Sequence, residues 1–254
     1  IIKTAYTLIA TTLLLCGCSE DTFLGNNTEE GKDVTISLTY SDVSPRDIVV
    51  NTRATEAEER HLDNLYIYVF DGNGNLKGYK DIESGLDQET NENHKAAING
   101  IKTRAGEAYI YAVANIQTGL YPVSTSSGSI ENGKLPIHLD ESKAQAGDYD
   151  FTLEDLKALS FLRNNPNTIQ ISSAFLMSGA VKQGNAVNIS TAGQIANGDN
   201  SIRLSRIVSK VKFTIKALKE SGVQRSFKLS TYDIMNIAID GSLIGKTDGN
   251  TRKM

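Results

Sequence analysis

The most constraining feature of this sequence is a series of short stretches with the two-residue period of β-strands. In residues 34–40 apolar and polar side chains alternate strictly, which predicts a strand with one buried face. Residues 108–115 are apolar at nearly every position, so this strand is predicted to be buried on both faces. Further strands are predicted at residues 175–181, 186–189, 202–217 and 227–239, with a short one at 47–51.

Residues 64–79 carry the pattern of a β-hairpin. Aromatic and β-branched side chains fill residues 64–70, the sequence Asp-Gly-Asn-Gly follows at 71–74, and residues 75–79 can form the returning strand. The loop has a superficial likeness to a calcium-binding loop. However, Leu76 stands where such a loop needs glycine, and Ile82 where it needs a bidentate glutamate, so we predict a turn.

One helix is predicted at residues 153–161. Thr152 can cap its first turn together with Asp155, and leucines at 153, 156 and 159 lie on one side, which favours a helix that covers a sheet. Many short strands, turns rich in Gly, Asn and Ser, and one or two helices together predict a mainly β fold with β-sandwich architecture.

The N-terminus has the pattern of an export signal. Lys3 precedes an apolar run at residues 5–15 that is too short to span a bilayer, which is typical of a secretory signal peptide. The sequence Leu-Cys-Gly-Cys at residues 15–18 resembles the lipobox of bacterial lipoproteins. This resemblance implies cleavage after Gly17 and acylation of Cys18, for example with palmitate.

Composition argues against several functional classes. Both cysteines of the chain lie in the signal region, which excludes cysteine-based catalysis and thiolate metal sites from the rest. The net charge of -4 and the absence of a Lys/Arg-rich run argue against nucleic-acid binding. The histidines at 61, 94 and 138 are isolated, and no nucleophile-elbow or phosphate-loop motif is present. We therefore expect no enzyme, no catalytic residue, no metal site and no cofactor.

Several segments, in this order and spacing, resemble the Bacteroidetes-type fimbrillins, which are the subunits of type V pili. They are the lipobox at 15–18, Thr-Arg-Ala at 52–54, Asn-Leu-Tyr-Ile-Tyr-Val-Phe-Asp at 64–71 with Gly74, and the strand at 108–115. Met-Ser-Gly at 177–179 and the segments 204–211 and 227–230 continue the match. The resemblance implies a fimbrillin-like β-sandwich with a transthyretin-like Greek key.

The resemblance also implies a route of assembly. A lipidated precursor reaches the outer membrane, and an arginine-specific protease cuts between Arg53 and Ala54, with Arg46 as the alternative site. The cut removes the lipid and a groove-filling strand, here residues 34–40. The open groove then accepts a donor strand from another fimbrial subunit, so that a homopolymer forms at the cell surface and serves adhesion.

The expected domain layout follows from these features. Residues 1–17 form the signal peptide and 18–53 the lipidated propeptide. Residues 54–198 form an N-terminal β-sandwich, and 199–254 begin a second β-domain that we expect to continue beyond Met254 and to hold the donor strand. Two alternatives stay open: an anchor or accessory subunit that keeps its lipid, and a surface glycan-binding lipoprotein. The latter is disfavoured because the chain has no Trp for sugar stacking. Shaft and tip positions, and any receptor, are not distinguished.

Overall fold

The computed structural model describes residues 30–42, 62–84, 86, 95–116, 123–124, 134–162, 176–206 and 240–244. In chain order its strands are β1 (Asp33–Asp42), β2 (Leu65–Asp71), β3 (Leu76–Ile82), β4 (Lys95–Arg104), β5 (Gly106–Ala114), β6 (Val123–Ser124), β7 (Leu135–Pro136), β8 (Ser160–Leu162), β9 (Met177–Val181), β10 (Val187–Ile189), β11 (Ser201–Arg206) and β12 (Asp240–Ser242). Its helices are α2 (Glu141–Ala146), α3 (Leu153–Ala158) and the short 3₁₀ turns η1 (Lys182–Gly184) and η2 (Ala196–Gly198).

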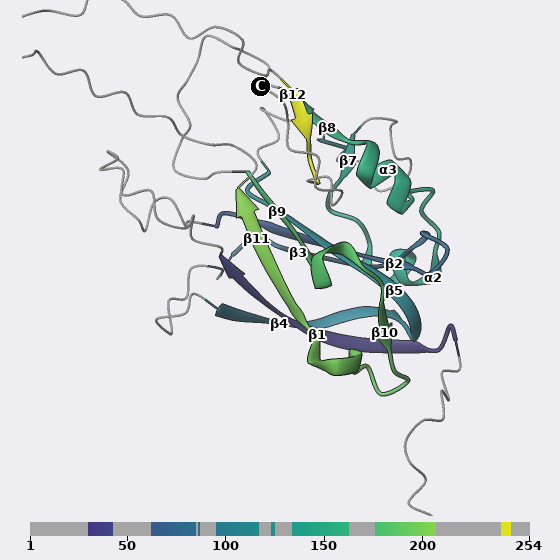
Figure 1. The fold of residues 1–254 in the computed structure, drawn as a ribbon. Helices are drawn as coiled ribbons and strands as arrows, with labels where there is room; N and C mark the ends of the chain where they lie inside the picture. The colour runs from purple at the N-terminus through teal and green to yellow at the C-terminus, as the bar shows by residue number, and fades with distance from the viewer. Residues whose placement is uncertain are drawn as a thin grey trace, which may run out of the picture.

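Most strands belong to one curled sheet, in the order β3-β2-β5-β9-β11-β1-β4, with β10 paired to β5 (Figure 1). All of these pairs are antiparallel except β1 with β11. The two end strands, β3 and β4, approach each other, since a Cβ atom added at Gly78 would lie 2.8 Å from the Lys102 carbonyl oxygen. The sheet therefore encloses a core, and the prediction of a mainly β, sandwich-like fold is confirmed.

Two hydrophobic cores lie on opposite faces of the central strands. In β2, Leu65, Ile67 and Val69 point into the enclosed core, whereas the alternating aromatic residues at 66, 68 and 70 point into a second core outside. In β5, Ile110 lies in the first core and Val113 in the second. Because successive strand residues face opposite sides, only a continuous apolar run can bury both faces. The prediction for residues 108–115 is confirmed.

The hairpin is also confirmed, as β2 and β3 pair through the predicted turn. One Asp71 carboxylate oxygen accepts hydrogen bonds from the backbone N–H groups of Asn73 (3.0 Å) and Asn75 (2.8 Å). This use of an aspartate side chain to fix its own turn is what short Asx turns do. The carboxylate organises the loop, as the turn interpretation requires.

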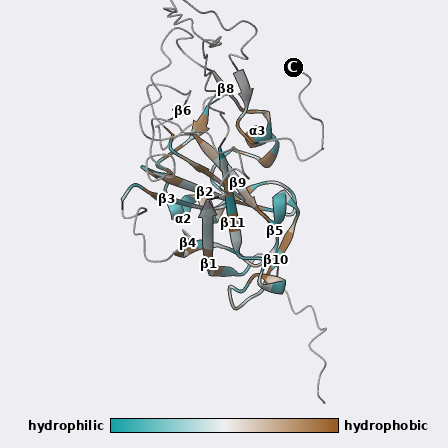
Figure 2. Cartoon of the chain, turned by 60° about the vertical axis from the view of Figure 1, so that its left-hand side comes forward, coloured by the Kyte–Doolittle hydropathy of each residue, from teal (hydrophilic) through white to brown (hydrophobic). Residues whose placement is uncertain are grey.

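Helix α3 begins as predicted but ends earlier. Thr152 and Asp155 form the reciprocal capping box, and Leu153 and Leu156 are buried in the second core. In Figure 2 the helix is brown and teal in alternation, as expected when one face covers a sheet. The predicted end at residue 161 is wrong, because residues 160–162 form β8 and pair with β12.

The expected start of a second domain at residue 199 needs correction. Strand β11 (201–206) lies inside the main sheet, between β9 and β1. Further along, Leu243 and Ile244 are buried in the second core. The predicted strands at 47–51 and 227–239, and residues 207–217 of another, lie outside the described residues. A second β-domain beyond β11 stays a prediction.

Alkaline pH should destabilise this fold. Burial raises the pKa of Tyr66, Tyr68, Tyr79 and Tyr111. The pKa of such a phenol is higher in the folded protein than in the unfolded chain, where it is about 10. Its contribution to the free energy of unfolding is therefore fully present below about pH 10. Above about pH 10 the unfolded chain loses protons first, and each such group removes up to about 1.4 kcal/mol per pH unit.

Urea unfolding followed by circular dichroism should therefore give a constant free energy of unfolding between pH 8 and 9 and a decline above about pH 10. Tyr68→Phe should reduce the steepness of that decline by the contribution of one group. A free energy of unfolding that stays flat through pH 11 would contradict the expectation.

Candidate functional site: the groove filled by strand β1

The first strand of the fold lies inside the sheet rather than at an edge. β1 runs between β4 on one side and β11 on the other (Figure 1). Its inward side chains, Val34, Ile36, Leu38 and Tyr40, are 8%, 1%, 0% and 5% exposed and belong to the enclosed core. The predicted half-buried strand at 34–40 is confirmed. Without it, the molecule would have a groove lined by the core and by two unpaired strand edges.

The two sides of this groove differ. β4 pairs with β1 along nearly its whole length, from Asp33 opposite Arg104 to Ser41 opposite Lys95. Between Ile36 and Leu38 the register shifts, because β4 carries an extra residue next to Gly100, whose φ is +79°. β11 pairs only with residues 39–42, in the parallel direction.

Along the first half of β1 the second side of the groove is formed by residues 190–200. The Thr39 N–H donates a 2.8 Å hydrogen bond to the Asn200 carbonyl oxygen. Gly193, with φ +75°, lies so close that an added Cβ atom would be 2.2 Å from the Thr35 carbonyl oxygen. This segment therefore closes over the strand, and only glycine fits at its contact point.

Replacing Gly193 with alanine should loosen β1. The matched control is Gly198→Ala, because Gly198 has a similar φ of +68° but no atom within 4 Å of an added Cβ. Both variants incur the cost of a left-handed alanine, about 1–2 kcal/mol. Gly193→Ala adds the clash with Thr35, so its loss should exceed the control by about 1–3 kcal/mol. Urea unfolding measures the difference, and equal losses would contradict the contact.

A buried hydrogen bond made by a tyrosine side chain lies at the far end of the groove. The Tyr40 hydroxyl donates a buried 2.6 Å hydrogen bond to the Leu86 carbonyl oxygen. Leu86 itself belongs to the enclosed core. A buried carbonyl left without a donor costs about 1–3 kcal/mol, so this bond helps to hold β1 in place.

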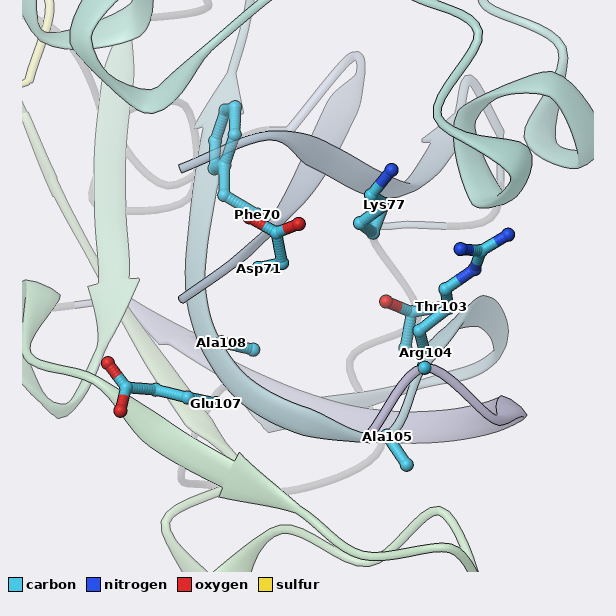
Figure 3. Close-up of a pocket in the computed structure, with 9 residues that line it drawn as sticks. Phe70, Asp71, Lys77, Thr103, Arg104, Ala105, Glu107 and Ala108 are labelled. Carbon is cyan, nitrogen blue, oxygen red and sulfur yellow. The ribbon is translucent and has the colours of Figure 1, made fainter. Parts of the chain in front are cut away.

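At the near end, β1 enters beside a small cavity of about 110 Å³ (Figure 3). Gly31 and Ala105 line it, and the Gly31 N–H donates to the Ala105 carbonyl oxygen at 3.0 Å. In Figure 3, Lys77 and Arg104 extend toward the same side, and Glu107 points away from them. The Thr103 hydroxyl is buried there without a protein hydrogen-bond partner. β1 thus begins beside an incompletely filled space.

The other edge of β4 lies against β3, since a Cβ atom added at Gly78 would be 2.8 Å from the Lys102 carbonyl oxygen, and helix α2 contacts both strands. Gln145 of α2 donates a 3.0 Å hydrogen bond from its side-chain amide to the Thr103 carbonyl oxygen. Glu141 of the same helix forms a 3.0 Å ion pair with Lys80 of β3. A covered edge cannot pair with a foreign strand. The edge of β4 that pairs with β1 is therefore the one that loss of β1 would leave unpaired.

The residues predicted for processing, Cys18, Arg46, Arg53 and Ala54, lie outside the described residues, as do His61 and His94. His138 is described, with its ring nitrogens 3.3 Å from an Asp81 oxygen and 3.5 Å from a Glu83 oxygen. Within the described ranges, no group of three or more His, Cys, Asp or Glu side chains could hold a metal ion. No helix in the same ranges is long and apolar enough to cross a membrane.

Sequence reasoning missed half of the groove. It did not predict β4, Leu86 or the contact of Gly193 with β1. The alternation of Ile98 and Ile101 is broken by the extra residue near Gly100, which hides the period of two. A glycine such as Gly193 can indicate that another backbone approaches closely. The signal is weak, because nothing in the surrounding sequence identifies the segment that approaches it.

A curled β-sheet domain with its own N-terminal strand built into the sheet is the class of protein that these observations define. The profile of the family described as "Major fimbrial subunit protein (FimA)" matches residues 33–206, which is over half of the chain. The chain belongs to this fimbrial subunit family, and the resemblance to fimbrillins is confirmed. No sequence among the curated proteins matches it.

Solved structures similar to this chain include two fimbrial proteins and one candidate cell adhesion protein. The tip fimbrial protein Mfa3 of Porphyromonas gingivalis, with a C-terminal truncation, is 16% identical over 69% of this chain and 48% of its own, with a TM-score of 0.39. A fimbrial assembly protein of Parabacteroides distasonis is 14% identical over 69% and 54%, with a TM-score of 0.37. A candidate cell adhesion protein of the same organism is 19% identical over 70% and 46%, with a TM-score of 0.39. This chain spans about half the length of these proteins.

Proposed function

We propose that this chain is a structural subunit of cell-surface fimbriae. It is delivered to the outer membrane as a lipoprotein, cut after an arginine and polymerised by strand exchange for adhesion. Membership of the fimbrial subunit family supports the fimbrial role. The observation that carries the mechanism is the position of β1, whose four inward side chains are core residues although the strand precedes the rest of the fold.

The order of segments along the chain supports proteolytic activation. Cys18 precedes β1, and Arg53 lies between β1 and β2. One cut between Arg53 and Ala54 therefore separates both the acylated end and the groove-filling strand from the body. Two or three acyl chains, at about 0.8 kcal/mol per buried methylene, hold the precursor on a membrane until that cut.

The opened groove favours addition of a strand from another subunit. It offers backbone N–H and C=O groups of β4 and β11 for ladder hydrogen bonds, and pockets for alternate side chains. An intact β1 occupies the same groups, so the precursor stays monomeric. The partners are then other fimbrial subunits, an arginine-specific protease and, before maturation, the outer membrane.

The proposal is tested with the full-length precursor and its Arg53→Ala and Arg46→Ala variants. After limited digestion with an arginine-specific protease, N-terminal sequencing should find Ala54, and gel filtration should show polymers. Arg53→Ala should lose both, whereas Arg46→Ala should behave like the wild type. A mature terminus at Asp47, lost together with the polymers in Arg46→Ala and not in Arg53→Ala, would place the cut after Arg46 instead.

Lipidation is tested separately in cells. Radiolabelled palmitate should enter the wild-type precursor and not Cys18→Ala, and equal labelling of both would exclude this site. If surface protein purified from cells keeps its acylated N-terminus, the chain is a lipid-retaining anchor subunit instead.

A further inference from the structure

The groove carries one chemical demand that its apolar pockets do not explain. Val34, Ile36 and Leu38 occupy hydrophobic positions that other aliphatic side chains of similar volume can fill at modest cost. Tyr40 differs, because its hydroxyl meets the Leu86 carbonyl oxygen at 2.6 Å in a buried position. The fourth pocket thus combines an apolar wall with one fixed hydrogen-bond acceptor.

We propose that the groove selects a donor strand with a tyrosine at its fourth inward-facing position. This inference rests on the proposed strand exchange and names the chemistry of the partner. The occupant is a segment of a second fimbrial subunit with the pattern apolar-x-apolar-x-apolar-x-Tyr. It runs parallel to β11 and antiparallel to β4, as β1 does.

The hydroxyl decides selectivity because its buried hydrogen bond to Leu86 comes from a side chain, whereas the ladder hydrogen bonds of β1 come from the backbone and are available to any strand. When the groove is open, water hydrates the Leu86 carbonyl. A phenylalanine in the pocket would displace that water without replacing its hydrogen bond. Sites built to bind a hydroxyl reject analogues that lack it far more strongly than hydrophobic pockets reject a changed methylene.

The opposite end contributes less. The Asp33 carboxylate lies 3.6 Å from the Arg104 side chain, and its own side chain is 69% exposed. Exposed ion pairs are screened by water and contribute little. The strand must also fit the register shift of β4 near Gly100, which fixes alignment, since a slip of one residue would turn all four inward side chains outward.

The test uses the full chain with a specific protease site inserted between residues 53 and 54. After cleavage, a fluorescent peptide of residues 31–42 is exchanged into the protein, and unlabelled peptides compete for the groove. The Tyr40→Phe peptide should compete at least about fivefold more weakly than the wild-type peptide. A Ser37→Ala peptide is the matched control, because this change also removes a hydroxyl but Ser37 faces outward, so competition should be unchanged.

The outcomes distinguish a failure of the preference for tyrosine from a failure of strand exchange. Equal competition by the Tyr40→Phe and wild-type peptides would overturn the selectivity for tyrosine and leave strand exchange standing. Failure of the wild-type peptide itself to enter the groove would overturn strand exchange and, with it, this inference. Weak competition by Tyr40→Phe with normal competition by Ser37→Ala supports the proposal.

Discussion

Loss of strand β1 is expected to lower the free energy of unfolding of this domain by about 6–12 kcal/mol, at about 1.5–3 kcal/mol for each buried apolar side chain. Four such side chains, Val34, Ile36, Leu38 and Tyr40, leave the enclosed core together. The whole stability of a typical domain is about 5–15 kcal/mol. A body without β1 should therefore be unfolded or bound to a replacement strand.

Cleavage alone should not unfold the protein, because the cut strand keeps its contacts. Cleavage changes β1 from a part of the same chain into a separate peptide ligand. The effective concentration of β1 then falls from the value set by the connecting chain to the concentration of the free peptide. The melting temperature of the cleaved protein should become dependent on protein concentration, and the intact chain should show no such dependence.

The measurement compares intact, cleaved and fragment-depleted protein by thermal unfolding. Added peptide 31–42 should restore the transition of the depleted protein. Leu38→Ala in the intact chain should cost about 2–5 kcal/mol, as expected for a residue that is 0% exposed. Ser37→Ala should cost little, because Ser37 faces outward. A depleted protein that melts like the intact chain would contradict the role of β1 in the core.

The strands that sequence predicted well are those whose pattern is local and unbroken. β1, β2 and β5 each show their burial directly, by alternation or by a continuous apolar run. α3 was found because a capping box marks its start. α2 was missed because its six residues bury only Ala144, too few for an amphipathic period.

The pairing of the strands was harder to predict from the sequence than their location. Residues 39–42 pair in parallel with 201–204, a contact between distant parts of the chain. The alternation of Ile202 and Leu204 predicts a strand with one buried face but does not say which sheet it joins. For this reason the sequence pattern alone places residues 201–206 in a second domain, although in the structure they border the groove. The resemblance to a family predicts that β1 fills a groove. Only the structure shows which residues line that groove.

The second large effect is expected at the centre of the sheet. Ile110 is 1% exposed in β5, which pairs with both β2 and β9. An aspartate there either buries an unpaired charge or remains protonated at a free-energy cost. It also removes a core side chain, so Ile110→Asp should cost more than about 4 kcal/mol and leave no cooperative unfolding transition.

The matched control introduces aspartate at a position that faces outward from the sheet. Ser205 in β11 is exposed and flanks Leu204, which is 0% exposed. Ser205→Asp should change the free energy of unfolding by no more than about 0.5 kcal/mol, as is usual for surface positions. Urea unfolding and near-ultraviolet circular dichroism report both effects. A soluble Ile110→Asp protein with a cooperative transition would contradict the central place of β5, because a residue at a sheet edge could turn the carboxylate into water.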